Sequence, residues 1–195
     1  MATRGIYGFR KNNYDKLNYN HFNSFPSGLG VDIVFFIKSH SLEEINKLCD
    51  ELIPLPYDTY FEELSPEQKN MMIEFAKEQH EDFEGKKLSY MLAPFEGNLE
   101  AYYDYPQVRL MRDDKEFIKN SLSCEWGYII NLDNNTLEIW QGFQSEPDIT
   151  NRYGVEIYYQ YETSNYYPCK LIKEYKLENI KTDKFSLQEF KRITE

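Results

Sequence analysis

The amino-acid sequence predicts an α+β fold, in which a mainly antiparallel sheet packs against a central helical segment. Two stretches of alternating apolar and polar residues, each interrupted by an Asn-containing turn, lie at residues 3–20 and 126–139. Residues 29–84 between them carry helix-capping patterns and apolar residues at helical spacing. Because strands and helices are grouped along the chain rather than alternating, an antiparallel sheet is favoured over a parallel one.

The length and composition are those of a folded protein. The 195 residues fit one domain and no linker-like stretch divides them, so residues 1–195 are expected to form a single α+β domain. Seventeen Tyr and 13 Phe supply large apolar side chains for a core.

No segment predicts a membrane span or an exported protein. The longest apolar stretch, residues 31–37, contains Asp32 and is far shorter than the roughly 20 residues that a membrane-spanning helix requires. Residues 1–5 lack the apolar core of a secretory signal, so we expect a cytoplasmic protein that binds no membrane. The three cysteines form no CxxC pair and the three histidines lack metal-ligand spacing, so no disulfide, metal or other cofactor is predicted.

The first predicted element is a hairpin. Residues 3–11 and 14–20 have the pattern of two strands joined at Asn12 and Asn13, because Asn tolerates the positive φ that a tight hairpin turn needs. A polar and aromatic loop over residues 21–30 follows. Alternation places Thr3, Gly5, Tyr7 and Phe9 on one face of the first strand and Arg4, Ile6, Gly8 and Arg10 on the other.

Helices are predicted next. One runs from about Leu29 through Ile37, and a second begins at Ser41, which forms a capping-box pattern with Glu44. Prolines at 54 and 56 end the second helix. A third is predicted from the sequence Ser65-Pro66-Glu67-Gln68, and a short one over residues 113–122. The apolar stripe of the third consists of Met71, Met72, Phe75, Ala76 and Phe83.

Strands return in the second half of the chain. Trp126, Tyr128, Ile130 and Leu132 alternate with other residues, and a turn at residues 133–135 leads into a returning strand. Further strands are predicted over residues 155–162 and 169–177, before a short terminal helix that starts at Ser186.

Charge is distributed unevenly. The 33 acidic and 22 basic residues give a formal charge of −11, which opposes direct binding of nucleic acid or an anionic membrane. Residues 1–31 carry +3, so the remainder carries −14. The segment 41–84 alone has thirteen acidic residues against three lysines, a pattern typical of solvated helix faces or of a surface for a basic partner.

The candidate site is therefore the cationic N-terminal block. Arg4 and Arg10 are candidate ligands for a phosphate or carboxylate group, with Asn20 and Ser24 as polar partners. His21 is a candidate general base and Thr3 a candidate nucleophile. Glycine within a strand marks close approach either of a ligand or of packed protein, so Gly5 and Gly8 leave both interpretations open.

Two resemblances bear on this block. The pattern TRGxxGF at residues 3–9 and the pattern YNHFxSxPSGLG at residues 19–30 resemble a family of uncharacterised bacterial and phage proteins, which implies no activity. The order of strand, hairpin and paired helices is also similar to the N-terminal part of N-terminal-nucleophile hydrolases. That resemblance implies Thr3 as nucleophile with Arg4 and Asn20 around the substrate, although Ala2 would be exposed by removal of Met1.

Three functions remain open at this point. The first is a binding or inhibitory protein with a cationic N-terminal pocket for a small anionic, nucleotide-like ligand. The second is a small amide- or phosphoester-cleaving hydrolase that uses the same residues. The third is an acidic antagonist that binds a basic protein partner. The sequence does not decide whether the protein is an enzyme, nor its oligomeric state.

Overall fold

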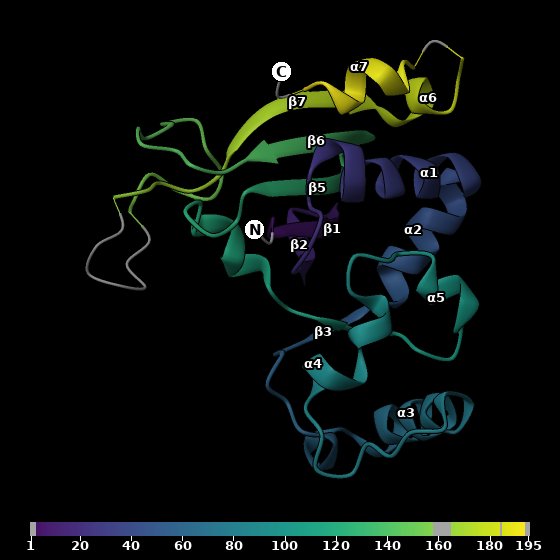
Figure 1. Cartoon of the computed structure of the whole chain (residues 1–195). Coiled ribbons are helices and arrows are strands. Elements are labelled where there is room, and N and C mark those ends of the chain that lie inside the picture. The colour runs from purple at the N-terminus through teal and green to yellow at the C-terminus, as the bar shows by residue number, and fades with distance from the viewer. Residues whose placement is uncertain (1–2, 158–164, 184, 194–195) are drawn as a thin grey trace.

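The computed structural model describes residues 3–157, 165–183 and 185–193, and its central element is a five-stranded sheet (Figure 1). Neighbouring strands are antiparallel except β1 and β5, which run parallel. The α+β architecture predicted from the sequence is thereby confirmed. In the order β2-β1-β5-β6-β7, the strands are Tyr14–Asn20, Gly5–Lys11, Trp126–Asn131, Thr136–Gln141 and Lys170–Lys176.

Both predicted hairpins form. Asn12 and Asn13 adopt positive φ angles of 54° and 58° in the turn between β1 and β2. Their backbone N–H groups donate to Asp133, at 2.7 and 2.9 Å, in the turn between β5 and β6. These two hydrogen bonds hold the pKa of Asp133 below its usual value, and the bond from Asn13 has the larger effect. The two turns therefore lie side by side at the same end of the sheet.

The two faces of the sheet pack against different partners. Tyr7 and Phe9 point into the main core, which they share with residues of the helices. Ile6 points to the other face, into a smaller cluster that includes Trp140. The alternation predicted for the first strand therefore describes its burial correctly. The smaller cluster also contains Leu17, Ile118, Cys124, Ile129 and Cys169.

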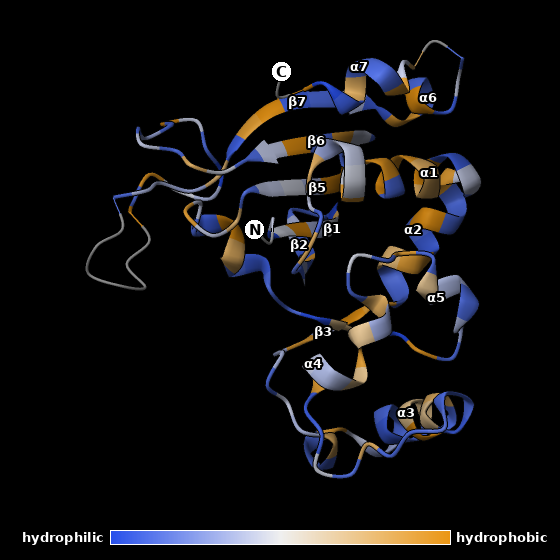
Figure 2. Ribbon diagram, viewed as in Figure 1, coloured by the Kyte–Doolittle hydropathy of each residue, from blue (hydrophilic) through white to orange (hydrophobic). Residues whose placement is uncertain are grey.

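The longer helices follow the first hairpin. A turn over Pro26–Gly30, in which Gly28 is not helical, leads into α1 (Val31–Ser39), and α2 (Leu42–Glu51) begins at the predicted capping box of Ser41 and Glu44. α3 spans Pro66–Gln79 and lies away from the five-stranded sheet (Figure 1). In Figure 2, α1 is mostly hydrophobic, whereas α3 is largely hydrophilic. Within the described ranges, none of the helices combines the length and the apolar character needed to cross a membrane.

The remaining elements are short. A second sheet consists of two parallel strands, β3 (Ile53–Leu55) and β4 (Leu110–Arg112). Figure 1 labels β3. The short helices are α4 (Leu88–Met91), α5 (Ala101–Asp104), α6 (Leu177–Ile180) and α7 (Leu187–Lys191), and 3₁₀ turns span Phe61–Glu63, Ala93–Phe95 and Lys115–Lys119.

Three sequence predictions differ from the structure in detail. α3 ends at Gln79 because His80 takes a positive φ of 55°, so Phe83 packs from the following turn rather than from the helix. Only residues 115–119 of the predicted segment 113–122 form a helical turn. Residues 155–157 form no strand, and residues 158–162 of that predicted strand lie outside the described residues.

The start of α3 provides a direct test of local structure. The Ser65 hydroxyl accepts from the Gln68 N–H, and the Gln68 side chain accepts from the Ser65 N–H. We expect Ser65→Ala to lower the free energy of unfolding by about 1 kcal/mol, because the substitution leaves a helix N–H without its cap. Urea denaturation measures this change. Ser145→Ala, at an exposed loop position, is the matched control and should leave the stability unchanged.

Candidate functional site

Three of the predicted site residues lie together where β2 leaves the sheet. Thr3, Asn20 and Ser24 are all buried there. The Ser24 N–H donates to the Thr3 carbonyl at 3.1 Å, and the Asn20 amide donates to the Ser24 hydroxyl at 2.7 Å. The Tyr128 hydroxyl donates to the Ser24 carbonyl at 2.9 Å. These hydrogen bonds attach the loop that follows β2 to the start of β1 and to β5.

Arg4 and His21 belong to the same end of the hairpin. The Arg4 N–H donates to the Glu125 carboxylate at 3.4 Å. His21 is exposed, with its Nδ1 atom 2.6 Å from the Tyr19 hydroxyl and its backbone N–H donating to Glu96. Burial raises the pKa of Tyr19, and the nearby Arg4 opposes this rise. The structure therefore brings Arg4 and His21 to the neighbourhood of Thr3.

Close packing accounts for the two strand glycines of this block. A Cβ atom on Gly5 would lie 2.6 Å from the Trp126 carbonyl and 2.7 Å from the Ser24 Cβ. A Cβ atom on Gly8, whose φ is +147°, would lie 2.1 Å from the Lys16 carbonyl. Of the two interpretations that the sequence left open, contact with packed protein is the one that the geometry supports.

Arg10 occupies a different place. It lies six residues after Arg4, close to the other end of β1 (Gly5–Lys11), beside the turn that leads to β2. At roughly 3.3 Å per residue of extended strand, the two arginines are about 20 Å apart. The predicted cationic residues therefore divide between the two ends of the hairpin.

At its own end, Arg10 lines a cleft of 420 Å³. Clefts that bind small molecules usually fall between roughly 300 and 1,000 Å³. Its walls come from the first hairpin, from the 3₁₀ turn Lys115–Lys119 and from residues 152–154. The charged side chains that line it are Arg10, Lys115, Lys119, Arg152, Asp15 and Glu116.

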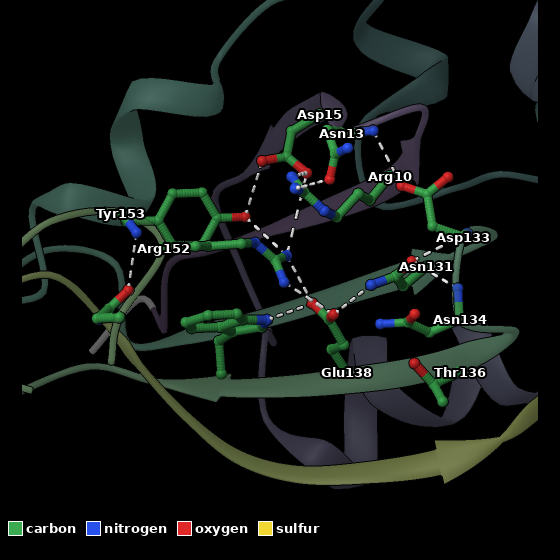
Figure 3. A network of polar contacts seen from close by, with 12 residues as sticks. Arg10, Asn13, Asp15, Asn131, Asp133, Asn134, Thr136, Glu138, Arg152 and Tyr153 are labelled. Carbon is green, nitrogen blue, oxygen red and sulfur yellow. Dashed lines mark hydrogen bonds and ion pairs between the residues drawn. The ribbon is translucent and has the colours of Figure 1, made fainter. Parts of the chain in front are cut away.

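A buried carboxylate, that of Glu138, holds Arg152 in place at the wall of this cleft (Figure 3). Glu138, on β6, is only 1% exposed. Its carboxylate accepts hydrogen bonds from both terminal nitrogens of Arg152, at 2.8 and 2.6 Å. Asn131 and Trp140 donate to the same carboxylate at 2.6 and 2.9 Å. Burial raises the pKa of Glu138, but hydrogen bonds and charge from Arg152 outweigh it, so the pKa lies below its usual value. Glu138 therefore remains ionised.

The network continues from Arg152 to the first hairpin. The Arg152 guanidinium stacks over Trp140 and Tyr153, with 4.6 and 4.9 Å to the ring centroids. It also donates to the Tyr153 hydroxyl at 3.0 Å, which in turn donates to Asp15 at 3.1 Å. Asp15 accepts from Arg10 at 3.0 Å. Figure 3 shows this continuous chain from Glu138 to Arg10.

Two lysines at the 3₁₀ turn are held less firmly. Lys115 pairs with Asp113 at 2.6 Å, and Lys119 pairs with Glu116 at 2.7 Å. The Lys119 and Glu116 side chains are 36% and 62% exposed. An exposed ion pair of this kind contributes about 0–1 kcal/mol, so it opposes a change of partner for Lys119 only weakly.

Most residues of this network were missed from the sequence. Arg10 was among the predicted ligand residues, whereas Glu138, Arg152 and Tyr153 were not. One signal was present: Glu138 lies between the apolar residues Leu137 and Ile139 in a returning strand, two positions before Trp140. A carboxylate on the same strand face as a buried Trp requires a partner, and that partner is Arg152.

Comparisons with known proteins do not assign the site. No family model, curated protein or solved structure matches the chain. Within residues 3–157, 165–183 and 185–193, no three His, Cys, Asp or Glu side chains are grouped so as to hold a metal ion. The three cysteines are buried and form no disulfide. The chemistry of the site therefore rests on its own geometry.

Proposed function

We propose that this protein binds a small anionic ligand carrying phosphate groups, such as a nucleotide, in the cleft beside Arg10 and Arg152. The observation that carries the proposal is the convergence of four cationic side chains on one 420 Å³ cleft in a protein of net charge −11. These side chains come from β1, from the 3₁₀ turn at 115–119 and from residue 152, three segments far apart in sequence.

The two arginines are suited to this role because their side chains are already ordered. Glu138 and two aromatic rings fix the Arg152 guanidinium, while Asp15 and Asn13 fix that of Arg10. A planar guanidinium presents several N–H donors that match phosphate oxygens. Because the order exists before binding, less conformational entropy is lost when the ligand enters.

Of the two lysines, Lys119 has the more easily displaced partner. Lys119 exchanges an exposed carboxylate partner, Glu116, for a phosphate that carries more negative charge. Lys115 is more firmly held, since the hydrogen bond from its ammonium group to Asp113 raises its pKa and keeps it cationic. The Lys115 ammonium group is therefore positively charged at neutral pH, as the proposed ligand requires.

The test is isothermal titration calorimetry with ATP and with inorganic pyrophosphate. Arg10→Ala is expected to weaken binding about tenfold or more, since a hydrogen bond between two charged groups contributes roughly 1.5–3 kcal/mol. Lys11→Ala is the matched control: Lys11 is the next residue of β1, and its ammonium group pairs with Asp50 instead of lining the cleft. It should bind like the wild type.

Two results would contradict the proposal. One is the absence of binding of both probes to the folded wild-type protein at low salt. The other is an equal loss of affinity in Arg10→Ala and Lys11→Ala, which would show that binding depends on the net charge of the protein and not on the cleft. Thermal unfolding of each variant shows whether Arg10→Ala remains folded once Asp15 has lost this partner.

A further inference from the structure

A second cavity lies on α3, in a part of the molecule that the proposed anion site does not use. It is a groove of 430 Å³ between α3 and the segments at residues 61–62 and 81–84. Figure 1 shows α3 at the end of the molecule opposite β7 and the terminal helices. The groove and the cleft beside Arg10 share no lining residue.

The floor of the groove is apolar. Met72 and Ala76 contribute from α3, and Phe83 contributes from the turn that follows. These three side chains are buried, whereas Ile73 on the same helix is 41% exposed. Phe61 completes the floor. Ile73 extends this apolar floor to the surface of the groove, where an apolar side chain of another molecule can contact it.

The rim of the groove is acidic. Four carboxylates line it against the two ammonium groups of Lys69 and Lys77. The Lys69 ammonium donates to the Glu62 carbonyl, while the Glu62 carboxylate accepts from the Gly85 N–H at 2.8 Å. That bond lowers the pKa of Glu62 and keeps it anionic. The four rim carboxylates belong to Glu62, Glu81, Asp82 and Glu84.

We propose that this groove docks a basic amphipathic helix of a protein partner. The apolar side chains of that helix, spaced at i, i+3, i+4 and i+7, would contact the exposed Ile73 and the floor beside it, while its Lys and Arg residues face the acidic rim. The proposal goes beyond the anion site and does not depend on it.

Charge complementarity selects this occupant over others. A second copy of the chain would bring a net charge of −11 toward a segment, 41–84, that has thirteen acidic residues against three lysines. Nucleic acid and anionic lipid are repelled by the same carboxylates. A basic peptide gains charge attraction at the rim and buries apolar side chains on the floor, so it satisfies both features.

The experiment uses fluorescence anisotropy with two labelled peptides. The first has roughly 18 Leu and Lys residues with Leu at i, i+3, i+4 and i+7, long enough to lie along α3 at about 1.5 Å per residue. The second has the same composition in scrambled order, so it carries the same charge without an apolar face. The full-length wild type is expected to bind the amphipathic peptide at least about tenfold more tightly than the scrambled one.

Two pairs of variants locate the binding. Ile73→Asp places a charge beside the apolar floor and should reduce the affinity at least about tenfold, whereas Ile149→Asp, at a residue that is 89% exposed and outside the groove, should not. Glu81→Lys combined with Glu84→Lys reverses charge at the rim and should also weaken binding. Glu146→Lys, in an exposed loop, is the control for that change.

The same measurements are able to overturn the proposal. Equal affinity for the two peptides would show that charge alone accounts for the binding. Unchanged affinity in Ile73→Asp, whose exposed position lets the chain remain folded, would place the binding elsewhere. A rim reversal that has no greater effect than Glu146→Lys would remove charge complementarity as the basis for the choice of partner.

Discussion

Replacing Glu138 with alanine is expected to lower the free energy of unfolding by about 3–5 kcal/mol, the cost of breaking a buried ion pair from one side. The carboxylate receives two hydrogen bonds from Arg152 and one each from Asn131 and Trp140. Its removal leaves the Asn131 and Trp140 donors without this acceptor, and it leaves the partly buried Arg152 guanidinium with Asp15, 4.0 Å away, as its remaining counter-charge. Urea denaturation followed by tryptophan fluorescence and by circular dichroism measures the change.

A double replacement provides the control for Glu138. Glu138→Leu combined with Arg152→Met removes both charges together, so it should recover most of the stability lost in the alanine variant. Equal destabilisation of the single and double variants would show that lost packing, rather than an unpaired charge, accounts for the effect. The double variant should also lose affinity for pyrophosphate, because it removes one of the two ordered guanidinium groups of the cleft.

The contribution of Glu138 to the free energy of unfolding depends on pH, because only its ionised form pairs with Arg152. Because the pKa of Glu138 is lower in the folded protein than in the unfolded chain, its stabilising contribution is complete above the ordinary carboxyl pKa. That contribution decreases as the pH falls through the lowered value. The stability of the alanine variant should therefore vary less with pH in the acidic range than that of the wild type.

Replacing Tyr7 with phenylalanine is expected to lower the free energy of unfolding by about 2–3 kcal/mol. The Tyr7 side chain is fully buried on β1, and its hydroxyl donates to the Phe95 carbonyl. The same oxygen accepts from the Asn18 amide and from the Gly97 N–H, each at 2.9 Å. Phenylalanine keeps the ring but leaves the Asn18 amide and the Gly97 N–H without this acceptor, while the Phe95 carbonyl keeps the Asn98 N–H as a donor. Urea denaturation is again the measurement.

Tyr102→Phe is the matched control for Tyr7. Its hydroxyl is equally buried and makes a single 3.2 Å bond, to the Leu110 carbonyl, so its loss should cost about 1 kcal/mol. Burial raises the pKa of Tyr7 well above its ordinary value, so the hydroxyl keeps its proton and the difference should not change between pH 6 and about pH 9. Equal losses in the two variants would contradict a special role for the Tyr7 contacts.

The elements that the sequence predicts well are those whose signals are local. Asn12 and Asn13 specify a tight turn, and Ser41 and Ser65 specify helix starts, through contacts within four residues. The parallel pairing of β1 with β5 depends on residues more than 100 positions apart, for which no local signal exists. The strands β3 and β4 have three residues each, too few for a periodic pattern to appear.

The candidate site was only partly predictable for the same reason. Charge distribution drew attention to Arg10, which lines the cleft. The residues that hold that cleft in place are Glu138, Arg152 and Tyr153, and only the folding of the second hairpin and the following loop brings them to Arg10. Composition and spacing along one chain do not contain that distance information. Three of the predicted site residues, Thr3, Asn20 and Ser24, lie together because the first hairpin brings them to the same end of the sheet.

The position of β1 between β2 and β5 has a consequence for the synthesis of the protein. One edge of β1 pairs at once with β2, but the other pairs with residues 126–131, which emerge from the ribosome only much later. Until then the nascent chain presents an open strand edge bearing Ile6, Tyr7 and Phe9, a template for pairing with other chains. Such late, long-range closure slows folding and makes early chaperone contact with the nascent N-terminal hairpin advantageous.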